Sequence, residues 1–324
     1  MKPRFAGPEG AARLHVLLLV LAVGLTVWVF AGPKGPAARP REAKDLVALL
    51  PADSALVATV DLTKLRGGAL SRALLRSGEA GDLGGPCGDY DPMAHAQALA
   101  LALPGGAARS DPSLVATGEW DVTRLVACVA RNAGGAAGPA DTASFRGFTV
   151  VRPRAEGDAE VAVHPRGLVL IAAGRQLRDL IDVADGTAPS AATAPEHRRL
   201  RARMGNAGTV LASWIVPAGW LLPFGTDALR SPLAGVRALA LRVDVGAEVR
   251  ARLLLEHASA EAAGDVAAVA RRLKEDGASL RLVGLGFVAD AGIGQREHEV
   301  EVELKLGLDE LERTLERLEA ASEE

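Results

Sequence analysis

Apolar side chains follow one another almost without a break from position 14 to position 30, in the run LHVLLLVLAVGLTVWVF. Only His15 and Thr26 interrupt it. Extended to Gly32, the segment reaches the roughly 20 residues that a helix needs to cross the hydrocarbon core of a bilayer. The preceding residues 1–13 contain Lys and Arg but form no apolar run. The pattern predicts a basic tail at 1–13 and a transmembrane signal anchor at 14–32.

A cleavable signal peptide is the alternative interpretation of the same segment. Ala31 and Gly32 satisfy the small-residue rule for a cleavage site, but the run exceeds the roughly 7–15 apolar residues of a usual signal core. We therefore favour a retained anchor. A short basic tail before the first apolar run favours a cytoplasmic N-terminus and a periplasmic bulk. Residues 33–46 are rich in Pro and Gly and are predicted to be a linker.

Downstream of the linker, the spacing of apolar positions changes between period two and the three-and-four spacing of a helix. The predicted strands cover residues 55–62, 98–103, 113–120, 145–152, 160–164, 168–172, 208–216, 236–245, 248–256 and 292–306. The predicted helices cover residues 66–77, 122–132, 175–184, 259–274 and 308–318. The apolar segment 278–290 fits either type of element.

Hairpins and alternating strands argue for antiparallel pairing. A polar connection at 186–195 divides the chain into predicted domains at 47–190 and 191–324. The second domain restarts like the first, because GTVLASWIV at 208–216 echoes SALVATVDL at 54–62. The predicted fold class is α+β, with an N-terminal transmembrane helix followed by two similar units of antiparallel sheet and helices.

Composition narrows the function classes. The 324 residues suggest about two domains, and 49% apolar residues exclude wholesale disorder. The net charge of -3 excludes the strongly basic footprint of a nucleic-acid binder. Aromatic residues make up only 3% of the chain, which weakens base-stacking platforms further. We expect no nucleic-acid partner.

Three short motifs carry a resemblance to known proteins. They are LPADSALVATVDLTKL, CGDYDP and ATGEWDVTRLVACV, and the likeness that they carry covers most of residues 48–185. The chain resembles a group of uncharacterised bacterial proteins that are single-pass or exported and have a tandem α+β ectodomain. Tyr90 and Trp120 stand where that group would have Phe. The group has no established activity, so the resemblance implies an architecture and no chemistry.

Cys87 and Cys128 are the two cysteines of the chain. Cys87 lies in a Gly-rich loop, and Cys128 lies on the apolar side of a predicted helix. In an oxidising compartment such a pair can form a disulfide, and this is the pairing that we expect. Two free buried thiols are the alternative. A reactive thiol is disfavoured because no motif places a histidine beside either cysteine.

Four glutamates alternate along the predicted strand 292–306, at Glu297, Glu299, Glu301 and Glu303. Period two places them on one face of the strand, with His298 on the other. They could bind a cation or a basic partner. We favour cross-strand ion pairs with the arginines of the neighbouring predicted hairpin, which are Arg242, Arg250 and Arg252.

The remaining sequence contains no pattern typical of a metal, cofactor or catalytic site. The histidines are scattered and form no HExxH, and no G-x-S-x-G is present. The Gly-Leu-Gly at 284–286 lacks the βαβ context of a dinucleotide turn. The arginine-rich run 198–203 could contact anionic lipid or an acidic partner, but a solvated helix face is favoured because the run is short and has no aromatic residue.

These observations predict a membrane-anchored envelope protein of the bacterial inner membrane. Residues 14–32 would contact the lipid bilayer. The periplasmic part would bind or scaffold an envelope protein without catalysis. Two alternatives stay open, namely an exported hydrolase whose site is made only in three dimensions, and a soluble periplasmic ligand binder released by signal cleavage.

Overall fold

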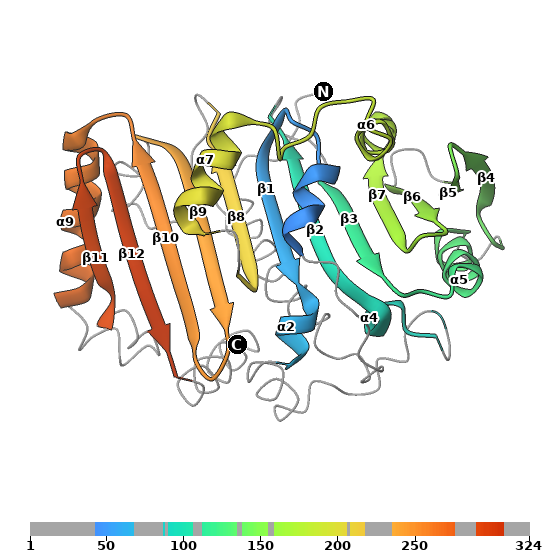
Figure 1. Cartoon of the computed structure of the whole chain (residues 1–324), viewed down its shortest axis with the longest axis horizontal. Helices are drawn as coiled ribbons and strands as arrows, with labels where there is room; N and C mark the ends of the chain where they lie inside the picture. The colour runs from blue at the N-terminus through green and yellow to red at the C-terminus, as the bar shows by residue number, and fades with distance from the viewer. Residues whose placement is uncertain are drawn as a thin grey trace, which may run out of the picture.

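In the described part of the chain, twelve antiparallel strands form one sheet (Figure 1). The computed structural model describes residues 43–67, 87, 90–105, 112–134, 138–154, 159–205, 208–217, 235–275 and 290–307. The predicted anchor at 14–32, most of the predicted helix 66–77 and the predicted helix 308–318 lie outside these residues. In the described ranges, no helix is both long and apolar enough to span a membrane.

The strands pair only with antiparallel neighbours, and the spatial order is β11-β12-β10-β9-β8-β1-β2-β3-β7-β6-β5-β4. Their bounds are β1 Ser54–Asp61, β2 Ala96–Pro104, β3 Ser113–Gly118, β4 Asp141–Phe145, β5 Phe148–Arg152, β6 Ala159–His164, β7 Leu168–Ala173, β8 Val210–Ile215, β9 Val236–Val245, β10 Val249–His257, β11 Gly292–Arg296 and β12 Glu299–Leu306. The predicted α+β class with antiparallel pairing is confirmed.

Helices lie on both faces of the sheet. Val57 of β1 packs against η1 and α6, and Thr59, two residues further, is contacted by α7, so these three helices share one face. We call it the α6 face. Helices α5 and α9 pack on the opposite face, the α5 face. The helix bounds are η1 Ala43–Leu49, α2 Leu62–Gly67, α4 Pro92–His95, α5 Val122–Gly134, α6 Arg175–Ala184, α7 Pro195–Met204 and α9 Ala260–Glu275.

The apolar core is divided by the sheet into layers. On the α6 face, Leu180 and Ile181 of α6 pack over the alanines of β2 and Leu170 of β7. On the α5 face, Leu125 and Cys128 of α5 belong to a buried cluster with side chains of β2, β3, β6 and β7, and the helix itself lies over β5 and β6. Small side chains in the central strands let the helices lie close to the sheet, and larger ones on the helices fill the space between.

The pairing of β1 with β8 joins the two halves of the chain into one sheet. Leu56 lies opposite Trp214 and Val60 opposite Val210, with Ala58 and Ala212 facing each other between them. Outward from this pair, the strands follow the orders β1-β2-β3-β7-β6 and β8-β9-β10-β12-β11. The hydrogen bonds of the sheet therefore continue without a gap across the predicted domain boundary.

Helix α7 covers this junction with two buried polar side chains. The Nε2 atom of His197 is 2.8 Å from the carbonyl oxygen of Ser54, and its Nδ1 atom is 2.8 Å from the hydroxyl of Ser213. A carbonyl only accepts, so Nε2 carries the proton and Nδ1 accepts from Ser213. Arg201 donates to the hydroxyl of Thr59 at 3.2 Å and to the carbonyl oxygen of Leu211 at 3.3 Å. One helix thus binds β1 and β8 together.

Arg201 corrects the prediction that residues 198–203 form a solvated helix face. Its side chain is buried, and burial lowers its pKa to about 10. Arg198, Arg199 and Arg203 are exposed as predicted. The run mixes both environments because a helix turns by 100° per residue, so one position in every three or four faces the sheet.

Replacing His197 by Leu tests the junction. The hydroxyl of Ser213 and the carbonyl of Ser54 would lose their buried partner, and we expect the free energy of unfolding to fall by about 2–4 kcal/mol. Urea unfolding followed by circular dichroism measures it. Arg198→Leu, on the exposed side of the same helix, is the control and should change stability by less than about 0.5 kcal/mol. Equal stability of the two variants would contradict the role of His197.

Candidate functional site

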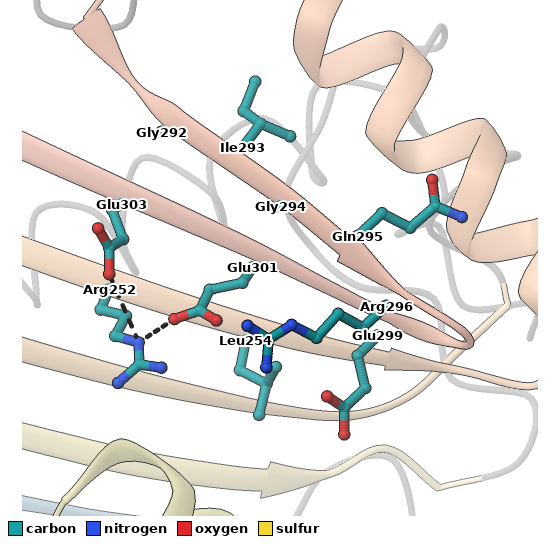
Figure 2. Close-up of a pocket in the computed structure, with 10 residues that line it drawn as sticks. All are labelled: Arg252, Leu254, Gly292, Ile293, Gly294, Gln295, Arg296, Glu299, Glu301 and Glu303. Atoms are coloured by element: carbon teal, nitrogen blue, oxygen red, sulfur yellow. Dashed lines mark hydrogen bonds and ion pairs between the residues drawn. The ribbon is translucent and has the colours of Figure 1, made fainter.

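A hollow of about 430 Å³ lies on the α6 face of the sheet, over the strands at one end (Figure 2). Strands β10, β12 and β11 supply its lining. Their register places Arg252 opposite Glu303 and Leu254 opposite Glu301. It also places Gly292 opposite Glu303 and Gly294 opposite Glu301. Directly opposed residues point to the same face of a sheet, so these side chains border one shared surface.

Two glycines of β11 produce the hollow. Gly292 and Gly294 occupy the positions at which β11 would otherwise place side chains on this face. A Cβ added at Gly294 would meet nothing within 4 Å, and one at Gly292 would make ordinary contact with the side chain of Glu303. Gln295 points to the other face, toward the helix (Figure 2). The floor of the hollow beside β12 is therefore bare backbone.

The predicted acidic stripe is present in part. Glu299, Glu301 and Glu303 share the face of β12 that borders the hollow. The predicted single strand 292–306 is wrong, because the chain turns back at Glu297 and His298 to form the hairpin of β11 and β12. Glu297 has a φ of 48° in this turn, and its side chain is 89% exposed. It does not belong to the stripe.

Arginines compensate the stripe, as the ion-pair interpretation predicts. Arg252 bonds to Glu301 and lies 3.8 Å from Glu303. The hydrogen bond to Glu301 raises the pKa of Arg252 above its usual value. From α7, Arg203 pairs with Glu299. The carboxylates beside the hollow are therefore largely neutralised by arginines of the same sheet and of α7.

Of the three arginines predicted to pair with the stripe, Arg252 alone does so among the described residues. Arg242 bonds to Asp244 at 2.7 Å, and Arg250 bonds to Glu248. Both pairs connect residues two positions apart on one face of the hairpin. The sequence correctly identified arginines that form ion pairs. It could not show whether each would pair with an acidic residue two positions away on its own strand or with a glutamate of β12.

Arg296 is the uncompensated cation of the hollow. It lies opposite Glu299 at the end of β11, is exposed, and its side chain makes no hydrogen bond or ion pair to any residue that the structure describes. A free guanidinium presents five donors in a planar fork that matches a carboxylate. The hollow thus offers a glycine floor, paired charges along one side and one free guanidinium at its end.

A disulfide joins Cys87 to Cys128, as expected, with the two Cα atoms 5.0 Å apart. Both residues are buried on the α5 face with Tyr90 and Leu125. The amide of Asn132 lies 3.5 Å from the sulfur of Cys128. The bond ties the chain before α4 to helix α5, on the side of the sheet opposite the hollow.

Of the histidines that the structure describes, His257 and His298 are close enough to interact electrostatically. His257 is buried at the end of β10, and neither of its ring nitrogens has a hydrogen-bond partner. His298 is half exposed in the turn after β11, and not on the face of a strand opposite the glutamates, where the period-two pattern placed it. In the described part of the chain, no group of three His, Cys, Asp or Glu side chains could hold a metal ion.

The comparisons with known proteins return a structural likeness only. No family model matches the chain, and no curated protein matches its sequence. Solved structures of TP0453 are similar, with a TM-score of 0.46 and 11% identity for crystal form I. Crystal form IV gives a TM-score of 0.48 and 12% identity. Each alignment covers 86% of this chain and 97% of that chain.

Replacing Arg252 by Met tests the ion pairs of the hollow. The Arg252 side chain is 40% exposed, so we expect a loss of only about 0.2–1 kcal/mol in the free energy of unfolding at low salt. Screening should shrink this difference in high salt. Arg250→Met, on the same strand but paired with Glu248, is the matched variant for urea unfolding at both salt concentrations. A loss of several kcal/mol, unaffected by salt, would show that Arg252 supports the sheet by packing instead.

A second test concerns pH. Burial lowers the pKa of His257 and of His197 in the folded chain. The unfolded chain then binds more protons below its histidine pKa of about 6.5, so stability is complete above that pH and falls as the pH drops through it toward the folded pKa values. His257→Leu should reduce the loss of stability between pH 7.5 and 5.5. His164→Gln, at a half-buried position, is the control and should keep the wild-type loss.

Proposed function

We propose that this protein is a membrane-anchored envelope protein whose extracytoplasmic part binds a protein partner without catalysis. Residues 14–32 would hold it in the inner membrane with the N-terminus in the cytoplasm. The observation that carries the proposal is the glycine-floored hollow with the free guanidinium of Arg296. Its shape and charge suit a segment of another polypeptide better than they suit a reacting group.

The compartment is supported by the disulfide. Disulfides persist in oxidising environments such as the periplasm and are rare in the cytosol. The Cys87–Cys128 bond closes a loop with a sequence separation of 41, for which loop closure alone gives about 4 kcal/mol of stabilisation. An exported chain would gain this stabilisation, whereas a cytosolic one would be kept reduced.

Two similar units, as proposed from the sequence, would explain the strand order. The echo between 54–62 and 208–216 corresponds to one constant offset along the chain. Moving along the chain by this offset takes Leu56 to Val210 and Val60 to Trp214. The paired residues Leu56 and Trp214 therefore correspond to Val210 and Val60, which also pair with each other. The register is thus what two copies related by a local two-fold axis would produce. The identical order of five strands outward from the axis supports the same origin.

The two units differ where binding is proposed. In the first, α6 covers β3, β7 and β6 with Leu177, Leu180 and Ile181. In the second, the corresponding strands β10, β12 and β11 present Arg252, the glutamates and the glycines on that face. Helix α7 lies mainly over β8 and β9 and reaches β12 through the ion pair of Arg203 with Glu299. The face that is apolar under α6 in the first unit carries several charged side chains in the second, which favours a solvated, partner-facing surface.

The expected partner is a polypeptide with a carboxylate placed to reach Arg296. A bidentate pair between a guanidinium and a carboxylate gives both energy and orientation. The compensated glutamates around it would contribute little affinity but would disfavour partners with unpaired negative charge nearby. A flat glycine strand lets the partner's backbone approach the sheet closely.

The experiment uses the full chain expressed in bacteria, with a photo-crosslinking amino acid in place of Gly294. We expect a full-length mass in the membrane fraction, cleavage by external protease in spheroplasts, and resistance of both cysteines to alkylation before reduction. Illumination should give a discrete protein adduct at position 294. The same crosslinker in place of Arg271, exposed on α9, is the control and should give none, and Arg296→Glu should abolish the adduct at 294.

Three outcomes would overturn parts of the proposal. A soluble species that begins at Gly32 would replace the anchor by a cleaved signal. Rapid alkylation of Cys87 and Cys128 in the untreated chain would argue against an oxidising compartment. An adduct at 294 that persists in Arg296→Glu would remove the guanidinium from the binding role.

A further inference from the structure

A second hollow, of about 440 Å³, lies in the first half of the chain on the α6 face. One side of α6 forms a wall, and the ends of β1, β2 and β3 form the floor. The segments before β1 and after α6 close it, and they are joined by the bridge between Pro51 and Ser190. Its volume lies within the range of about 300–1,000 Å³ that is usual for small-molecule sites.

One shielded polar atom of this hollow, and one further hydroxyl, lack partners among the described residues. The carbonyl oxygen of the Gln176 side chain is shielded from solvent and accepts no hydrogen bond. Ser113 is 3% exposed, and its hydroxyl bonds to no residue that the structure describes. Unsatisfied buried polar groups are uncommon in folded proteins because each has given up its water. Both side chains line the hollow, so a bound molecule could satisfy them.

The carboxylates of the hollow add negative charge. Asp53 is exposed at its mouth and pairs with no described residue. Asp179 lies 3.8 Å from the guanidinium of Arg175, whose side chain is 91% exposed, so this pair is weak. Asp182 is already bonded to Arg146. The groups left to meet a ligand are therefore the carboxylates of Asp53 and Asp179, an amide oxygen, a hydroxyl and the exposed guanidinium of Arg175.

We propose that this hollow binds a small organic cation with a primary ammonium group on a short aliphatic chain. An ammonium has three donors and no acceptor, which matches Asp53, Gln176 and Ser113 as acceptors. Ala102 and Val183, together with prolines of the two flanking segments, give the aliphatic chain an apolar wall. Anionic ligands would meet acceptors and carboxylates and are disfavoured. The site lies apart from the hollow of β10–β12 and does not depend on its function.

The test is calorimetric titration of the full chain in detergent with 1,5-diaminopentane. Uncharged 1,5-pentanediol and anionic glutarate are the matched probes of the same length. We expect saturable binding of the diamine alone. Gln176→Met keeps the shape of the side chain but removes the acceptor, and Asp53→Asn removes the charge. Each should weaken binding at least about tenfold. Gln176→Met would leave an ammonium donor unpaired, and Asp53→Asn would remove the charge that assists the hydrogen bond.

Asp265→Asn is the control variant, since Asp265 is exposed on α9 and lines neither hollow. It should bind the diamine like the unmodified chain. Equal binding of diol and diamine, unchanged binding in Gln176→Met, or equal weakening by Asp265→Asn and Asp53→Asn would overturn the proposal. So would the absence of saturation at millimolar diamine with every variant folded by circular dichroism.

The same titration separates two sources of the ammonium. Tighter binding of N-acetyl-lysine amide than of diaminopentane would indicate a lysine side chain of a partner. Tighter binding of the free diamine would indicate a soluble amine. Either result supports the ammonium site.

Discussion

The backbone pairing of β1 with β8 is the constraint on which the rest of the structure depends. Without it the chain would form two smaller sheets, each with a long open edge at its first strand. Pairing these two edges removes the exposed hydrogen-bonding groups from the middle of the molecule. Helix α7 then adds side-chain bonds to both strands through His197 and Arg201. Arg201 keeps a charge in this junction although only neutral oxygens accept its described bonds, which makes the junction specific at some cost in desolvation.

The junction also determines where the two hollows lie. With β1 and β8 in the centre, β11 and β4 become the outer edges of the sheet. The hollow with Arg296 is open because it lies near the β11 edge, where glycines replace side chains. The hollow with Gln176 lies nearer the centre, beside α6, and the side-chain oxygen of Gln176 there is shielded from water. One site is therefore open, with a free guanidinium beside paired charges, and the other holds a shielded acceptor without a partner.

Local pattern predicted much of the fold. Helix α6 and strand β9 have the bounds that the periodicity gives, because apolar spacing and flanking turn residues agree there. The β11–β12 hairpin was missed because period two continues on both sides of its turn, and Glu297 adopts a positive φ without the Gly or Asn that usually marks one. Burial of Arg201 was missed because its partners, Thr59 and Leu211, are brought to it only by the β1–β8 pairing.

The same limit explains why neither hollow could be read from the sequence. The glutamate stripe attracted attention because it is periodic, yet arginines neutralise it, and a compensated pair at a surface contributes little to binding. Gln176 and Ser113 belong to no motif. Their significance comes from burial without a partner, a property that arises only when α6 is laid over the ends of β2 and β3. A buried acceptor that lacks its bond discriminates between ligands more strongly than a solvated charge does, because a ligand without the matching donor leaves it unsatisfied.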